Sequence, residues 1–426
     1  MRSLRRRSRH RADRRAAGIH SQACRANQRA LPDMSTSTFT TGNLAVLGGV
    51  PALPQRLALG QHNFPSWDRY EAAFRDIFAR QYYTNHGPLA QVLEARLAER
   101  LQVRHAMCVT NATIGLALAA QALGLKGKVI VPAFSFVNTA QSLAWADVEV
   151  EFCDVSRETG HLSPETVEPL LRDGISGILG VNLWGDATDV EALQALAARH
   201  GVALYFDSAQ GFGCEISGKP LGGFGRLEVI SFHSSQILGS TEGAVICTDD
   251  DDLAAHIRNI RSNYGMGRPV PVGKTGNGRL SEAQAAIALM NLDDLPELIA
   301  RNRRVFNAYE ALLRDVPGLR LRKPEQVSAS NFQNVVYEMD ASAFGLSRNA
   351  LIEVLRAENI EAAGDRGLGA RRGAASVVLP NTGYWCDSVL QLPTGAQADE
   401  AVVERIATVI RTAQCHSARI AAIFGA

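Results

Sequence analysis

Polar residues follow two short apolar runs of the chain, where a buried strand would end. Thr110–Thr113 lie between a β-rich run and a helical run. Backbone N–H groups at a helix N-terminus, together with the Thr113 hydroxyl, can bind an anion such as phosphate. Simple helix capping by Asn111 is the alternative. Asp207 ends the apolar run Val202–Phe206, and ligands of open α/β sheets bind beyond the carboxyl ends of strands.

A carboxylate at Asp207 can pair with the protonated nitrogen of an aromatic ring and keep that ring electron-withdrawing. Gln210, three residues later, can reach an oxygen substituent of the same ring. Helix capping by Asp207 is again the alternative. The following Gly211–Gly213 lacks the third glycine of a dinucleotide-binding loop, which argues against a Rossmann dehydrogenase.

Three further segments carry groups that suit the same kind of ligand. Phe136 follows the apolar run Val129–Pro132 and can stack on a flat ring, although core packing is the usual role of such a residue. Ser231–Gln236 offers hydroxyls for a phosphate. Asn277 lies in a Gly-rich stretch and by itself indicates a turn.

The elements that must position these residues alternate between strand and helix patterns. This alternation predicts an α/β fold with a large, doubly wound, mostly parallel sheet in residues 34–300, and a smaller α+β domain in residues 301–426. The predicted strands are 107–110, 129–131, 148–152, 177–181, 202–206, 229–232, 244–248 and 331–338, with 229–232 and 244–248 forming a hairpin-like pair. The predicted helices are 114–125, 190–200, 281–313 with an interruption at Pro296, 350–358 and 401–413.

Composition restricts the class of protein. The net charge of +1 conceals ten Arg and two Asp in residues 1–33, and the rest of the chain is mildly acidic, which gives no reason to expect a nucleic-acid partner. The basic segment is an upstream extension with Met34 as the true start, a disordered arm, or an organellar transit peptide. Seven scattered cysteines without a C-x-x-C pair predict neither a metal site nor disulfides. No apolar stretch is long enough to span a membrane, so we expect a cytoplasmic protein.

Taken in order, the motifs resemble those of the DegT/StrS-type sugar aminotransferases. The resemblance runs from about Tyr82 to about Leu313. Its segments are Thr84–Pro88 (T-N-x-G-P), Pro132–Phe136 (P-x-x-[ST]-F), Asp207–Gln210 (D-[AS]-A-[HQ]) and Asn277–Glu282 (N-G-[KR]-M-[NS]-E).

This resemblance implies an aspartate-aminotransferase-like, fold-type-I fold and the cofactor pyridoxal phosphate (PLP). Ala112, Thr113 and Ser231 would then hold the cofactor's phosphate. The substrate would be a small molecule such as a nucleotide-linked keto sugar.

By the same resemblance, Phe136 would stack on the cofactor ring, Asp207 would pair with ring nitrogen N1, and Gln210 would lie beside O3′. Asn277 would reach the cofactor of a neighbouring subunit, to which Thr84–Pro88 also contribute. The resemblance therefore implies a homodimer.

The chain departs from the family motif at its centre. Ser231–Ser235 match the motif S-F-H-[AS]-[TS]-K, and Gln236 then stands where the family has its Schiff-base lysine. A carboxamide can neither form an imine nor shuttle a proton. His233 also occurs in lysine-bearing relatives, so we interpret it as scaffold more readily than as a replacement base. Lys219 and Lys274, in a turn and a Gly-rich loop, are poor substitutes.

Three hypotheses follow for the function. The first is a natural lysine-less enzyme that holds PLP or pyridoxamine phosphate (PMP) without a covalent bond. The second is a repurposed, PLP-independent enzyme or a non-catalytic binding protein that has lost the cofactor. The third is an aminotransferase in which lysine was replaced by engineering, but residues 237–243 also diverge from the family.

Arg366, Arg371 and Arg372 replace the family's aromatic substrate segment and leave nucleotide-sugar specificity open.

Overall fold

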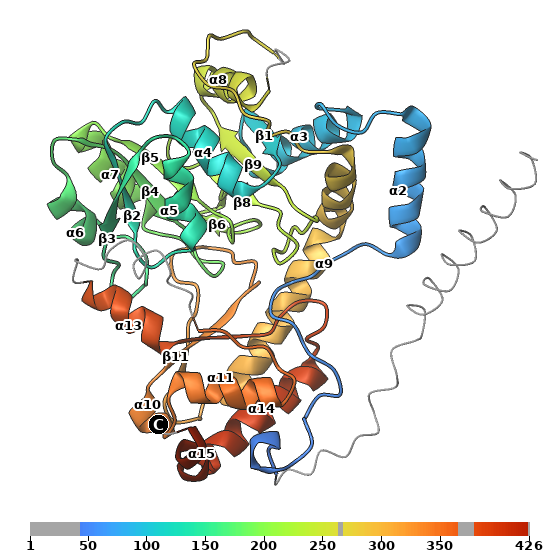
Figure 1. Ribbon diagram of the computed structural model, residues 1–426, viewed down its shortest axis with the longest axis vertical. Helices are drawn as coiled ribbons and strands as arrows, with labels where there is room; N and C mark the ends of the chain where they lie inside the picture. Colours follow the sequence, from blue (N-terminus) through green and yellow to red (C-terminus); the bar gives the residue numbers. More distant parts are fainter. Residues whose placement is uncertain (1–42, 263–266, 365–378, 425–426) are drawn as a thin grey trace, which may run out of the picture. The chain divides into compact units, whose positions relative to one another are not determined.

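Seven strands form the main sheet of the computed structural model, which describes residues 43–262, 267–364 and 379–424. The order across the sheet is β1-β9-β8-β5-β4-β2-β3 (Figure 1). Only β9 runs antiparallel to its neighbours. The strands span His105–Val109 (β1), Lys128–Pro132 (β2), Glu149–Cys153 (β3), Ile175–Val181 (β4), Ala203–Asp207 (β5), Glu228–Ser231 (β8) and Ala244–Thr248 (β9).

Helices cover both faces of this sheet, because its strands are apolar on both sides. One core cluster joins alternate strand residues such as Val131 and Tyr205 to helices α4, α5 and α8. Two other clusters pack the opposite face, with residues such as Phe206, against α3, α6, α7 and α9. The bounds are Pro88–Leu101 (α3), Ala112–Ala122 (α4), Val137–Ala144 (α5), Pro164–Val167 (α6), Val190–His200 (α7) and Asp251–Arg261 (α8). The doubly wound sheet predicted from the sequence is confirmed.

A second, antiparallel sheet of three strands forms from the C-terminal part of the chain, in the order β10-β11-β12. Its strands are Leu319–Leu321, Val335–Met339 and Val389–Leu392. The helices of this region are Ala341–Phe344 (α10), Arg348–Ala357 (α11), Pro380–Ser388 (α13), Glu400–Cys415 (α14) and Ser417–Phe424 (α15). The predicted strand at 331–338 therefore begins four residues too early, because 331–334 are a polar segment that leads into β11.

The long helix α9 (Glu282–Leu313) links the two regions. It packs against α3 at one end and against α14 at the other (Figure 1). The predicted interruption at Pro296 is wrong, since α9 continues through this residue. Pro296 is exposed, and a proline there costs one backbone hydrogen bond to the carbonyl four residues earlier without removing buried contacts. The domain boundary predicted at residue 300 falls inside α9 and stays a prediction.

The remaining short elements are Ala45–Leu47 (η2), Trp67–Arg80 (α2), Glu168–Leu170 (η3), and the hairpin of Glu215–Ile216 (β6) and Lys219–Pro220 (β7). Among the described helices, none combines the length and the apolar character that a bilayer crossing requires. Residues 1–33, with their three alternative interpretations, lie outside the described residues.

Replacing Pro296 by alanine should stabilise the protein. The variant regains a helix N–H and loses the steric clash of the ring, and it gives up a smaller entropic benefit of proline in the unfolded chain. We expect a gain of about 2 kcal/mol in the free energy of unfolding, measured by denaturant titration. Glu297→Ala, at the exposed neighbouring position, is the control and should change stability by less than about 0.5 kcal/mol. A loss of stability in Pro296→Ala would show that the proline is needed in α9.

Candidate functional site

The candidate residues that follow strands lie at one edge of the main sheet. Asp207 is the last residue of β5 and Ser231 is the last residue of the adjacent, parallel strand β8. His233 and Gln236 follow β8 directly. Because parallel strands end at the same edge, the structure brings these side chains to a common side of the sheet.

Asp207 is buried, with an exposed fraction of 6%. Its Oδ2 accepts a hydrogen bond of 2.7 Å from the Thr139 hydroxyl, and its Oδ1 accepts one of 3.1 Å from the Ala209 N–H. Burial raises the pKa of the Asp207 carboxyl, and these two hydrogen bonds oppose that shift in part. A cationic partner would favour the charged form, so this carboxyl suits the protonated nitrogen of a ring.

The N-terminus of α4 lies beyond the end of β1. Asn111 is its N-cap, and its side chain accepts a hydrogen bond of 2.9 Å from the Ile114 N–H. The capping role that the sequence allowed for Asn111 is therefore confirmed. Ala112 and Thr113 form the first turn and are half-buried, which leaves this turn accessible to an anion.

Phe136 follows β2 by four residues, and Ser231 is the last residue of β8. Phe136 precedes α5 as its N-cap, and 54% of its surface is exposed, so core packing is not its role within this chain. The Ser231 side chain is buried, and its Oγ accepts a hydrogen bond of 3.2 Å from the His233 N–H. The His233 ring is more exposed and faces Ser235, whose Oγ lies 2.8 Å from its Nδ1.

Two glutamines near this edge have defined partners. Gln210 Oε1 accepts a hydrogen bond of 2.6 Å from the backbone N–H of Trp184. Gln236 is half-buried, and its Oε1 accepts a hydrogen bond of 3.0 Å from Gln333 Nε2. Gln333 also donates to the backbone oxygen of Gln210 at 3.1 Å. Gln333 therefore links Gln210 to Gln236.

Sequence reasoning missed Gln333, Asn331 and Thr139. Asn331 donates to the backbone oxygens of Gln210 and Phe212. The signal was present, because residues 331–334 read Asn-Phe-Gln-Asn before the apolar start of β11, and so many amides are unusual in a strand. Thr139 lies one turn after Phe136, on the buried side of α5.

The motif segments Thr84–Pro88 and Asn277–Glu282 meet within the same chain. Glu282 is fully buried, and its carboxylate accepts hydrogen bonds of 3.0 Å from the N–H groups of Leu89 and Ala90, at the start of α3. A Cβ at Gly87 would lie 2.6 Å from the Glu282 side chain, which explains the glycine. Asn277 is exposed, so a contact from it to another subunit stays a prediction.

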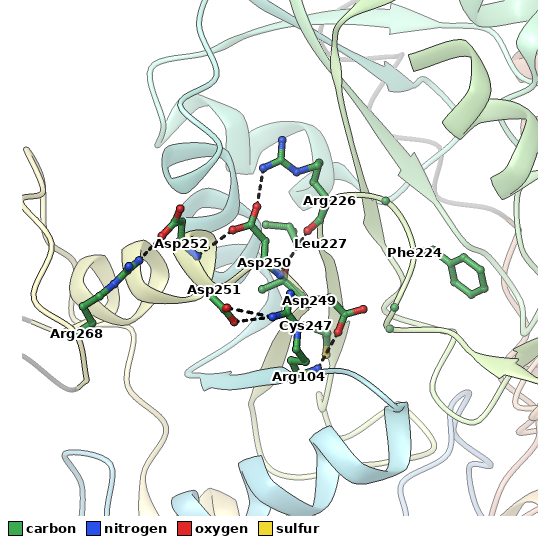
Figure 2. A pocket seen from close by; sticks show the side chains of 14 residues that line it. Arg104, Phe224, Arg226, Leu227, Cys247, Asp249, Asp250, Asp251, Asp252 and Arg268 are labelled. Carbon is green, nitrogen blue, oxygen red and sulfur yellow. Dashed lines mark hydrogen bonds and ion pairs between the residues drawn. The ribbon is translucent and has the colours of Figure 1, made fainter. Parts of the chain in front are cut away.

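A pocket of about 540 Å³ lies at the opposite edge of the sheet, where β1 and β8 begin and β9 ends (Figure 2). Its charged side chains pair with one another. The ion pairs are Arg104–Asp251, Arg226–Asp250 and Arg268–Asp252. None of the predicted site residues lines it, and its charges are already compensated, so we do not assign the chemistry to this pocket.

The groups at the edge where the parallel strands end are of the kinds that can bind PLP. A helix N-terminus and a buried serine suit a phosphate, an exposed aromatic ring suits a flat heterocycle, and a buried carboxyl suits its protonated nitrogen. Within the described residues, no group of three or more His, Cys, Asp or Glu side chains could hold a metal ion. Arg366, Arg371 and Arg372 lie outside the described residues.

The fold is that of a fold-type-I, PLP-type aminotransferase. Residues 68–411 match the DegT/DnrJ/EryC1/StrS aminotransferase family, and the chain belongs to this family.

Individual relatives agree with this assignment. A dTDP-4-amino-4,6-dideoxy-D-glucose transaminase of Shigella dysenteriae is 29% identical over 368 residues, which cover 82% of this chain and 97% of that protein. The crystal structure of DesI in the presence of its TDP-sugar product is 35% identical, with a TM-score of 0.85, and covers 91% of this chain and 100% of that chain. An Escherichia coli GDP-4-keto-6-deoxy-D-mannose-3-dehydratase with bound hydrated PLP shares the fold, with 20% identity, a TM-score of 0.74, and coverage of 84% and 100%.

Replacing Asp207 by asparagine should stabilise the ligand-free protein in a pH-dependent way. Because the folded-state pKa of Asp207 is raised, ionisation costs stability as the pH rises through that pKa, and the cost is absent below the unfolded-state value of about pH 4. We expect Asp207→Asn to melt a few degrees above the parent at about pH 7 and at the same temperature near about pH 4. Glu191→Gln, at an exposed position of α7, should show no such trend. A difference that does not depend on pH would refute the raised pKa.

Proposed function

We propose that this protein is a lysine-less member of its family that binds PLP or PMP without a covalent bond. The observation that carries the proposal is the neutral Gln236 side chain, which is hydrogen-bonded to Gln333 and follows β8 at the edge of the sheet where β5 ends in the buried Asp207. An amide at this position holds a ligand by hydrogen bonds alone.

The positions of the lysines support non-covalent binding. The chain has only five lysines: Lys126, Lys128, Lys219, Lys274 and Lys323. Lys126 and Lys128 lie at the amino end of β2, the edge opposite Asp207. Lys219 donates to the Gly223 carbonyl at 2.5 Å, and Lys274 and Lys323 pair with Asp147 and Glu310.

The phosphate and the ring of the cofactor would be held by separate groups. Ala112 and Thr113 at the start of α4, with Ser231, would hold the phosphate. Asp207, kept in place by Thr139, would keep the ring nitrogen protonated. The bound cofactor supplies an electron-withdrawing ring, which stabilises negative charge on an attached carbon.

Two further residues would position the cofactor ring, one against its face and one at its edge. Phe136, exposed just after β2, would cover the ring's face. The Gln210 Oε1 is occupied by the Trp184 N–H, so its Nε2 is the atom that would donate to the ring oxygen O3′. His233 contacts Ser235, which supports a scaffold role rather than that of a base.

The proposed substrate is a nucleotide-linked sugar with an amino or keto group. The support is the identity with the transaminase of Shigella dysenteriae and with DesI over nearly the whole of those chains. Gln236 cannot carry a proton between carbon atoms. Amino transfer that begins with PLP and amino transfer that begins with PMP both need this proton transfer, so another group must act as the base.

We also propose a homodimer, formed through the aromatic face of α2. Helix α2 packs against α9 and has Ile77 as its buried residue. Trp67 and Phe78 on this helix are more than half exposed, and Tyr82 and Tyr83 beside it are nearly half exposed. An apolar patch of this kind marks a protein interface, and two-fold dimers are the commonest assembly.

The mode of cofactor binding can be tested on the parent and on Gln236→Lys. The parent loaded with PLP should release all of its cofactor on denaturation, as PLP without borohydride and as the corresponding free alcohol after borohydride treatment, with none left attached to the protein. Gln236→Lys should gain a yellow, borohydride-reducible link and the corresponding mass, because a buried lysine amine loses its proton more readily. Gln236→Met, of similar girth and without an amine, is the control. A reduced cofactor found on one of the five native lysines of the parent would overturn the lysine-less proposal.

The dimer can be tested by light scattering. The parent should have twice the mass of one chain at micromolar concentration, and Trp67→Ser/Phe78→Ser should shift it toward the monomer with weaker cofactor binding. Trp145→Ser, which changes an exposed tryptophan at the end of α5, is the control and should leave the mass unchanged. A monomeric parent that still binds cofactor would contradict the proposal.

A further inference from the structure

Gln333 lies in the segment that leads into β11, and its side chain makes three hydrogen bonds. The residue is buried, with an exposed fraction of 4%. Its Oε1 accepts a hydrogen bond of 2.9 Å from the Ile237 N–H. Its Nε2 donates to the Gln210 carbonyl at 3.1 Å and to Gln236 Oε1 at 3.0 Å. A carboxamide has two N–H hydrogens, and Gln333 uses both; its oxygen accepts one hydrogen bond of the two that it could accept.

The orientation of the Gln333 amide follows from backbone chemistry. The Ile237 N–H can only donate, and the Gln210 carbonyl can only accept. If the Gln333 amide were turned over, its Nε2 would face the Ile237 N–H and its Oε1 would face the Gln210 carbonyl, and both contacts would be repulsive in a buried place. One orientation therefore satisfies both backbone groups.

The main chain of Gln333 is held equally firmly. Its carbonyl accepts hydrogen bonds from Gln61 Nε2 at 2.9 Å and from the Thr394 hydroxyl at 2.6 Å. Its N–H donates to Asn331 Oδ1 at 2.9 Å. The residue cannot move aside without breaking several buried hydrogen bonds.

This arrangement determines which atom of Gln236 faces which way. Because Gln333 presents an N–H hydrogen, the atom of Gln236 opposite it must be the accepting Oε1. Its Nε2, with two donor hydrogens, is then directed away from Gln333. Within the described residues, no hydrogen bond uses Gln236 Nε2.

We propose that Gln333 is a positioning residue that fixes Gln236 as a neutral hydrogen-bond donor to a carbonyl or anionic oxygen of the bound ligand. The inference rests on the proposed function, because it assumes that the ligand occupies the edge where Gln236 lies. In place of an amine that would form a covalent bond, position 236 then offers two N–H hydrogens in a direction set by the second sheet. Hydrogen bonds to charged acceptors are about twice as strong as neutral ones, so the donor matters most for an anionic oxygen.

Gln333→Glu and Gln236→Glu test this proposal with nearly isosteric changes. A carboxylate at 333 can only accept, so it should turn the Gln236 amide and leave an oxygen facing the ligand. A carboxylate at 236 keeps the hydrogen bond from Gln333 and removes the donor hydrogens. Titration of the parent and both variants with PMP and with PLP should show a loss of affinity of at least about tenfold in each variant.

The NMR signal of the Gln236 side-chain amide distinguishes a positioning role of Gln333 from a purely structural one. In glutamine-labelled protein, the Gln236 NH₂ resonance is identified as the one missing from Gln236→Glu. It should shift when PMP is added to the parent and stay unchanged in Gln333→Glu. Gln326→Glu, at an exposed position in the same approach to β11, is the matched control and should behave as the parent. If Gln333→Glu does not fold, the Gln236 resonance of the parent and the affinity of Gln236→Glu still decide the question.

The outcomes distinguish this inference from the proposed function. If the parent binds PMP or PLP, but neither variant loses affinity and the Gln236 resonance does not respond, the positioning role is wrong and the proposed function stands. If the parent binds neither cofactor, the proposed function fails, and the donor role fails with it.

Discussion

The common direction of β2, β4, β5 and β8 is the constraint on which the candidate site depends. Parallel strands deliver their last residues to one edge, and the alternation of side chains along β5 then selects what each residue meets. Tyr205 and Asp207 face α4 and α5, where Thr139 holds the carboxyl, while Phe206 faces the core on the other side. A slip of one residue in β5 would exchange these faces and place the carboxylate in an apolar cluster.

A set of buried carboxamides joins helix α9 to residues 61–63. Asn302 Nδ2 donates to Gln61 Oε1 at 3.0 Å, and Asn291 Nδ2 donates to the Asn63 carbonyl at 2.9 Å. Both asparagines belong to α9, the helix that spans the two regions. A buried amide has a direction, since its donor and acceptor ends cannot be exchanged without loss. Since Gln61 also donates to the Gln333 carbonyl, these contacts help to specify where the segment before β11 lies, which apolar packing alone would define less sharply.

The main sheet could be predicted from the sequence because each strand is a separate apolar run that ends in a polar residue. The site residues after those strands, such as Asp207 and Ser231, could be found for the same reason. Pro296 led to the wrong prediction of an interrupted helix, because the helix propensity of a single residue is a weak constraint on a helix that packs against other helices at both ends. Gln333 could not be assigned, since its partners are 97 and 123 residues away in the chain and no local pattern encodes such a pairing.

The surroundings of position 236 bear on why a glutamine stands there. Gln333 must turn its Nε2 toward this position, because the Ile237 N–H occupies its oxygen. A protonated lysine at 236 would offer only hydrogens to that Nε2, and two donors would face each other in a half-buried place. A carboxamide offers an oxygen and removes the conflict. Gln333 is thus complementary to a glutamine side chain at position 236.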